Sequence, residues 1–203
     1  NPDFPEYRNE TKLLNSKINY IKKTSSHRFV SGFEFQNRGI KSLDRGNHND
    51  YYIGGYINFV KSLSKITLNP SFRIDYNEAY NIQLCPQLDI NYNNSKYNLR
   101  LSAGRSIRSA DFTERFYNNN YPDTLSPGRN IGNPDLSAET SINFELGFDY
   151  KRYKNIILKN TVFYRKSTDL IDWVLLKSDE IFTELLLVEN ENYLFAQNIS
   201  NLN

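Results

Sequence analysis

Apolar and polar residues alternate without interruption in two neighbouring stretches of the chain. In residues 65–76 and 81–92, every even position is apolar or aromatic, and every odd position except Cys85 is polar. Successive side chains of a β-strand point to opposite faces, so each stretch predicts a strand with one apolar and one polar face. At twelve residues each, both are longer than the ~5–6 residues of a usual strand.

Further strands follow from the same alternation, and no sustained period of 3.6 residues predicts a long helix. The additional strands are expected at residues 11–23, 27–40, 51–61, 96–107, 140–151 and 155–170, with a ninth strand that begins near Tyr193. The connections at 24–26, 62–64, 93–95 and 152–154 are short. Those at 41–50, 108–139 and 171–192 are longer, and 77–80 is a short exception on the same side. An up-and-down membrane barrel has this asymmetry.

Three features favour a membrane barrel over a soluble β-sandwich, in which alternation also occurs. The strands are long enough to cross a bilayer at a tilt, which takes about 9–11 residues. The apolar faces of the strands at 65–76, 81–92 and 140–151 carry no charge, and Arg105, on the apolar face of 96–107, lies near the outer end of its strand. Tyrosines also collect where strands meet the short turns, as expected of a membrane interface. They are Tyr20, Tyr92, Tyr97 and Tyr150.

The predicted fold class is therefore all-β, an antiparallel up-and-down transmembrane β-barrel of which this chain is a part. Barrels of single bacterial chains have an even number of strands, and lipid cannot satisfy an open sheet edge. About nine strands do not close such a barrel, so residues 1–203 are expected to be one segment of a single barrel domain, cut at both ends.

Composition excludes several other classes of protein. The net charge is +2 with mixed signs, so there is no basic block for nucleic acid. The chain holds 15 Tyr, 13 Phe and no Met, which suits strands. The single cysteine, Cys85, excludes an internal disulfide and a cysteine-based zinc site. No apolar run is long enough for a transmembrane helix.

The sequence offers no catalytic or metal-binding motif. His27 falls at a short turn, and His48 lies near Asp44, Asp50 and Tyr51 in a segment expected to be a solvated outer loop. There is no phosphate-binding loop, nucleophile elbow or zinc motif. We therefore expect no enzyme activity, no metal site and no cofactor.

Two segments carry a family resemblance. Residues 99–118 (LRLSAGRSIRSADFTERFYN) and 132–151 (GNPDLSAETSINFELGFDYK) resemble paired motifs of TonB-dependent outer-membrane receptors, with the siderophore and cobalamin receptors as the nearest type. Ala110, Arg115 and Ala138 depart from the family pattern. The matching positions are Gly104, Arg108, Glu114, Gly132, Asn133, Pro134, Glu139, Glu145 and Gly147.

The resemblance implies a barrel of roughly 22 strands in the bacterial outer membrane, surrounded by lipid. It also implies energy-coupled uptake of a scarce ligand such as an iron–siderophore or cobalamin. The partner would be the TonB energy-coupling complex, reached through a plug domain that this chain does not contain. A passive porin and a soluble β-sandwich binding module remain as alternatives.

The long connection at 108–139 is the expected ligand surface, because aromatic side chains with one cation suit large polar-aromatic ligands. The alternative is that the same residues pack the loop onto its neighbours. Arg108 is expected to pair with an acid such as Glu114. The candidate ligand residues are Phe112, Phe116, Tyr117, Tyr121 and Arg129.

Overall fold

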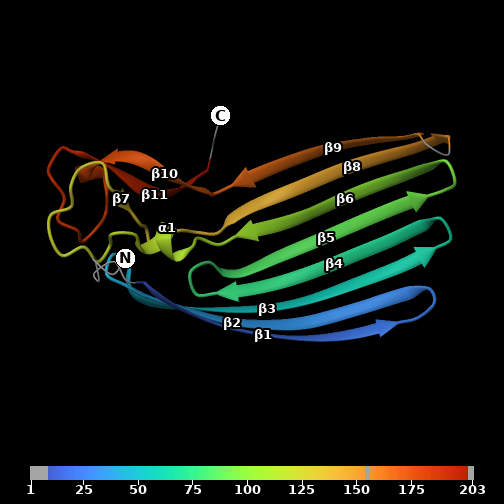
Figure 1. Ribbon diagram of the computed structural model, residues 1–203, viewed down its shortest axis with the longest axis horizontal. Coiled ribbons are helices and arrows are strands. Elements are labelled where there is room, and N and C mark those ends of the chain that lie inside the picture. The colour runs from blue at the N-terminus through green and yellow to red at the C-terminus, as the bar shows by residue number, and fades with distance from the viewer. Residues whose placement is uncertain (1–8, 154–155, 201–203) are drawn as a thin grey trace.

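Antiparallel strands dominate the computed structural model, which describes residues 9–153 and 156–200. Eight of them form one sheet, called the wall, in which each strand pairs with the sheet strand that precedes it in the chain (Figure 1). In order they are β1 (Glu10–Lys23), β2 (His27–Ser42), β3 (Gly46–Leu63), β4 (Ile66–Asn77), β5 (Asn81–Asn93), β6 (Tyr97–Arg108), β8 (Glu139–Tyr153) and β9 (Ile156–Thr168). The predicted up-and-down architecture is confirmed, and the sheet is not closed.

The two strands with faultless alternation match their predicted bounds to within one residue, whereas β2 and β3 run further than expected. The loop predicted at 41–50 is wrong, since β2 ends at Ser42 and β3 begins at Gly46. Pairs such as Arg38↔Asp50 and Ile40↔His48 continue the ladder through a polar region. Backbone pairing persists there although the apolar alternation that signals a strand has faded.

A second sheet lies beyond the long-loop end of the first (Figure 1). It contains β10 (Leu170–Lys177), β11 (Asn192–Ile199) and the short β7 (Asn130–Ile131), in the order β10-β11-β7. The strand predicted near Tyr193 is therefore β11, but it pairs with β10 and not with β9. The loop expected at 171–192 contains β10 and the 3-10 helix η2 (Ser178–Glu180). Residues 154 and 155, assigned to a turn and a strand start, lie outside the described residues.

The two faces of the main sheet differ in burial in the opposite sense to a water-soluble sheet. The face that carries Phe72, Leu88 and Leu146, called the apolar face, leaves these side chains 39%, 42% and 49% exposed. The opposite, polar face buries Asp75 and Asp149 to 4% and 9%. Among the described residues no second sheet covers the apolar face, so the β-sandwich alternative does not fit.

Aromatic rings meet across strands where the short turns lie. The Tyr92 and Tyr97 ring centroids are 6.4 Å apart, and those of Tyr97 and Phe148 are 6.5 Å apart. Of the four expected tyrosines, Tyr92 and Tyr97 thus meet along this edge of the apolar face, and Tyr150 is the ladder partner of Tyr97. In the part of the chain that the structure describes, no helix has the length and apolar composition to cross a membrane.

The ladder between β5 and β6 stops partway along the strands. It runs from Asn93↔Asn98 to Gln87↔Gly104 and ends next to Pro86, which has no N–H to donate. Beyond that point residues 81–86 of β5 stay paired with β4, and residues 105–108 of β6 stay paired with β8. We call the resulting gap the fork.

Candidate functional site

A cluster of ion pairs lies on the polar face of β2, β3 and β4. Arg73 Nη2 lies 3.1 Å from Glu34 Oε2, and its Nε lies 2.8 Å from Asp75 Oδ1. The Tyr52 hydroxyl donates to Asp75 and accepts from Arg73. Opposite charges are held together across three strands, so the cluster fixes the polar face rather than offering a free charge.

This cluster lines a cavity of about 440 Å³ that reaches the fork. Tyr80, in the turn between β4 and β5, and Arg105 complete its lining. Burial raises the pKa of the Tyr80 hydroxyl to about 12, with help from the nearby carboxylates Asp75 and Asp50. The hydroxyl therefore stays protonated at neutral pH and can act as a hydrogen-bond donor.

Further along the polar face, Arg100 Nη1 lies 2.5 Å from Asp149 Oδ2. The motif residue Gly147 makes this possible, because an added Cβ would lie 2.6 Å from Arg100 Nη2. Glu145 is exposed on the same face, and Gly104 is the last residue of β6 to pair with β5. These three motif residues thus belong to the wall of the sheet.

A short helix, α1 (Phe112–Phe116), begins the connection after β6. Asp111 caps it, because its side chain accepts from the backbone N–H groups of Thr113 and Glu114. The Glu114 carboxylate in turn accepts from the Asp111 N–H at 2.9 Å. This reciprocal capping box satisfies N–H groups that would otherwise lack partners at the helix start.

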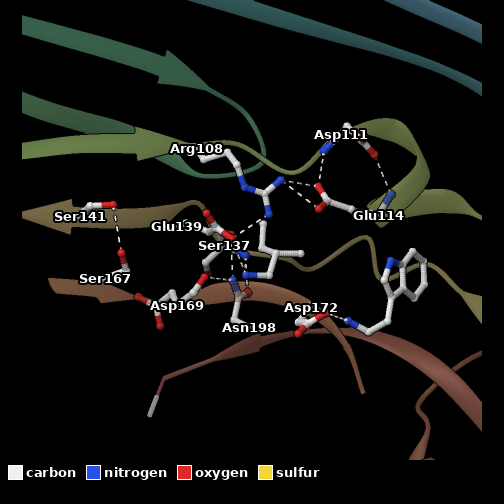
Figure 2. Close-up of polar contacts among 12 residues, drawn as sticks. Arg108, Asp111, Glu114, Ser137, Glu139, Ser141, Ser167, Asp169, Asp172 and Asn198 are labelled. Carbon is white, nitrogen blue, oxygen red and sulfur yellow. Dashed lines mark hydrogen bonds and ion pairs between the residues drawn. The ribbon is translucent and has the colours of Figure 1, made fainter. Parts of the chain in front are cut away.

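Arg108, the last residue of β6, joins this helix to two strands (Figure 2). Its Nη1 lies 2.9 Å from Glu114 Oε1, and its Nη2 lies 2.7 Å from Glu139 Oε1. Glu139, the first residue of β8, is buried and also accepts from the Ile171 N–H of β10 at 2.7 Å. The expected Arg108–Glu114 pair is present, and Glu139 extends it into an interlock of β6, α1, β8 and β10.

The chain returns to β8 against the back of the helix. Gly132 N–H donates to Tyr117 O at 2.8 Å, and Asn133 N–H donates to Glu114 O at 2.9 Å. A Cβ on Gly132 would lie 2.5 Å from the backbone nitrogens of Phe116 and Tyr117, so no larger residue fits. The Gly132–Asn133 motif is therefore a backbone-to-backbone contact, followed by the exposed Pro134.

The aromatic face of α1 packs on the outer end of β3. The Phe116 ring stacks on His48 with centroids 3.6 Å apart and an interplanar angle of 5°. The predicted place of His48 in a solvated loop is therefore wrong. Burial lowers the pKa of Arg115, whose guanidinium carbon lies 4.7 Å from the Phe116 ring centre. An open cleft of about 580 Å³ runs alongside, between His48, Asn120 and the segment that includes Phe182.

The five candidate ligand residues fall into two groups. Phe112 and Tyr117 are part-buried and lie 5.5 Å and 5.4 Å from the guanidinium carbons of Arg38 and Arg45, and Phe116 is buried on His48. Tyr121 and Arg129 are exposed. The structure brings the first group together against β2, β3 and the turn between them, and leaves the second on the surface of the loop.

A small core holds the rest of this connection in place. Tyr193 of β11 is fully buried, and its hydroxyl donates to Leu125 O at 2.8 Å and accepts from Val188 N–H at 2.9 Å. Asn198 of β11 bonds to Ser137 and to Asp169 O (Figure 2). Among the described residues, no three His, Cys, Asp or Glu side chains gather as a metal site would require.

The geometry has a counterpart among known families. Residues 4–195 match the family described as TonB dependent receptor-like, beta-barrel. The chain belongs to this family. The match spans the wall strands and the interlock around Arg108, so the resemblance seen in the motifs at 99–118 and 132–151 is confirmed. A search of curated proteins gave no match.

Solved structures with the same fold come from several receptors. The siderophore receptor PirA from Pseudomonas aeruginosa has a TM-score of 0.76 and 19% identity, over 95% of this chain and 37% of that one. A mutant ferric enterobactin receptor, PfeA, from the same organism gives 0.73 and 15%, over 95% and 32%. The FrpB iron transporter from Neisseria meningitidis gives 0.67 and 14%, over 94% and 31%. The chain thus spans about a third of the length of each of these proteins.

The sequence analysis did not predict α1 or β10, although each has a local sequence signal. It also did not predict two contacts that have no local signal. Asp111 and Glu114 have the spacing of a capping box, which predicts a helix start. The run Leu170–Lys177 is apolar enough to predict a strand. By contrast, nothing local in the sequence indicates that His48 lies under Phe116, or that Tyr193 donates to Leu125, because each pair is joined only by the fold.

Proposed function

We propose that this chain forms part of the wall and outer surface of a receptor that imports a scarce metal chelate across the bacterial outer membrane. The observation that carries the proposal is the exposed apolar face of a family barrel, opposite a polar face that holds the carboxylates of its strands. Lipid fits the first face, and a hydrated lumen or plug fits the second. Catalysis is not part of the proposal.

The ligand class follows from the family and its solved relatives. The PfeA structure similar to this chain was determined in complex with enterobactin, and PirA is described as a siderophore receptor. We propose an iron–siderophore as the ligand here, with cobalamin as the second metal chelate to test. Energy would come from the TonB complex through a plug domain elsewhere in the parent protein.

Within the chain, we propose that Tyr121 and Arg129 contact the ligand. Both are exposed on the loop surface, and an aromatic ring beside a cation suits a polar-aromatic ligand. Phe112, Phe116 and Tyr117 pack against β2, β3 and the turn between them, so in this proposal they support the loop that presents the other two.

Uptake by whole cells tests the proposal. Cells that express the full-length parent protein should accumulate radiolabelled iron–siderophore, and a protonophore or loss of TonB should abolish this accumulation. Labelled cobalamin in parallel separates the two ligands. Uptake that persists without energy would support the passive porin instead, and recovery of the parent protein outside the outer-membrane fraction would refute the location.

For the contact residues, Tyr121→Ala and Arg129→Ala should each weaken chelate binding by about five- to tenfold, as expected of a ligand contact worth roughly 1 kcal/mol at a partly exposed site. Ser126→Ala, an exposed change in the same loop, is the matched control. Binding that is unchanged in both variants would place the ligand elsewhere on the receptor.

A further inference from the structure

An open cleft lies where the connections after β2, β6 and β10 meet. Its volume is about 580 Å³, within the ~300–1,000 Å³ of small-molecule sites. The stacked rings of His48 and Phe116 line one side, and residues 182–184 of the β10–β11 connection line another. Tyr121 and Arg129 are not among the residues that line it, so the cleft is separate from the ligand contacts proposed above.

Phe182 is held in position with almost no packing of its own. Its side chain is 98% exposed, although it lines the cleft. Ile181 before it is buried, and Leu185 and Leu187 after it pack against the core around Tyr193. The backbone on both sides of Phe182 is therefore anchored, while the ring is free to contact a ligand. An aromatic face attracts cations and also contacts apolar groups.

The charged side chains that line the cleft are predominantly acidic. Glu184 and Asp135 are exposed, and in the described part of the chain neither forms an ion pair. The guanidinium of Arg45, which also lines the cleft, has the Asp44 carboxylate 3.9 Å away. Burial lowers the pKa of His48, so its imidazole is neutral at pH 7. A ligand in the cleft therefore meets two carboxylates that no cation neutralises directly.

The rest of the β10–β11 connection strengthens this negative field. Residues 178–191 include five carboxylates and neither Lys nor Arg. Arg115 lies near Asp135 but is not among the residues that line the cleft, and its guanidinium carbon is 4.7 Å from the Phe116 ring centre. Charges of one sign act together on a ligand of the opposite sign. The cleft thus favours a cation and disfavours an anion.

We propose that this cleft binds an organic cation, that is, an ammonium or guanidinium group attached to an apolar body. The body contacts the Phe182 ring, and the positive charge faces Glu184 and Asp135. Cation–π attraction and charge-assisted hydrogen bonds to carboxylates supply the affinity. The site goes beyond the proposed function, because a chelate held by Tyr121 and Arg129 does not require a cation in this cleft.

Saturation-transfer NMR on the full-length parent protein in a nonionic detergent tests the site, with the signal of empty micelles subtracted. Benzylammonium is the probe, with benzyl alcohol as the neutral comparison and benzoate as the anionic one. The wild-type protein should bind benzylammonium about fivefold more tightly than benzyl alcohol, and should not bind benzoate.

Phe182→Ala and Glu184→Gln should each weaken benzylammonium binding about threefold, and the double variant about tenfold. Both side chains are exposed, so the changes leave the fold intact. Leu186→Ala and Glu189→Gln are the matched controls, because they change exposed residues of the same connection that do not line the cleft. They should leave binding unchanged.

Three outcomes would overturn the proposal. They are equal binding of the three probes, wild-type affinity in the double variant, and an equal loss in the controls. Energy-dependent chelate uptake that persists in the double variant supports a separate site, whereas loss of uptake there would show that the cleft belongs to the chelate site. Benzylammonium binding by a protein that imports no chelate would refute the proposed function and leave this site intact.

Discussion

Replacing Arg108 with Ala should loosen the whole connection between β6 and β8. The change removes the partner of the buried Glu139, which would keep only the Ile171 N–H, and it leaves Glu114 with only the Asp111 N–H. Hydrogen bonds to charged groups contribute about 1.5–3 kcal/mol each. Because the Arg108 side chain is 44% exposed, water recovers part of this loss, and we expect a net cost of about 2–3 kcal/mol.

Hydrogen exchange in the full-length parent protein measures this free-energy cost at individual amides of the connection. The amides of Gly132 and Asn133 bond to Tyr117 O and Glu114 O. They therefore exchange only when the segment around Gly132 that leads into β8, called the return segment, separates from α1. A cost of 2–3 kcal/mol corresponds to exchange that is roughly 30- to 150-fold faster. Arg108→Lys should lie in between, because an ammonium cannot hold both carboxylates in the same fork geometry.

The control is Arg129→Ala, which removes an exposed arginine from the same connection. It should leave exchange at Gly132 unchanged. If Arg108→Ala also leaves it unchanged, then the core around Tyr193 holds the segment by itself, and the ion pairs contribute nothing measurable to it.

Two further predictions concern the wall and the return segment. Phe72→Arg or Leu88→Arg should each cost roughly 2–4 kcal/mol of barrel stability, because each places a charge on the lipid face. Ser71→Arg, on the polar face, should be tolerated. Equal loss of folded protein for all three variants in an outer-membrane fractionation assay would contradict the assignment of the faces. Gly132→Ala should displace α1, because its Cβ would overlap the Phe116 backbone, and should speed proteolysis of residues 109–138. Gly128→Ala, where the Cβ meets nothing within 4 Å but φ is +78°, should cost only about 1 kcal/mol, so equal proteolysis of both variants would argue against the close contact.

The wall could be predicted from the sequence because lipid and water impose opposite demands on alternate residues. Residues 65–76 and 81–92 carry that contrast along their full length, and β4 and β5 match them. The contrast disappears where β2 and β3 extend past the apolar band, so the strand ends near Ser42 and Gly46 were missed. There most residues of both faces are polar, so the strands carry no alternating signal, although backbone pairing and contacts such as Arg38 with Asp50 continue.

The outer connection was harder to predict for a different reason. The Arg108–Glu114 pair spans six residues and could be anticipated from charge and spacing. The role of Glu139 as a link to β10 depends on strands that meet only in the folded chain, as does the stacking of Phe116 on His48. Nothing in the local sequence of 108–139 distinguishes a ligand contact such as that proposed for Tyr121 from a packing contact such as that of Phe116.

The bonds that hold the outer connection also set an order of assembly. The β2–β3 hairpin closes through a turn of three residues, 43–45, whereas Asn120 bonds to Leu43 O across 77 positions and Tyr193 bonds to Leu125 O across 68. Contacts between distant positions form late, since the intervening chain must first be ordered. The strands of the main sheet can therefore pair one hairpin after another before residues 109–138 become ordered. Docking of α1 onto β3 becomes the final step, and protease resistance of that segment marks a receptor whose strands are already in register.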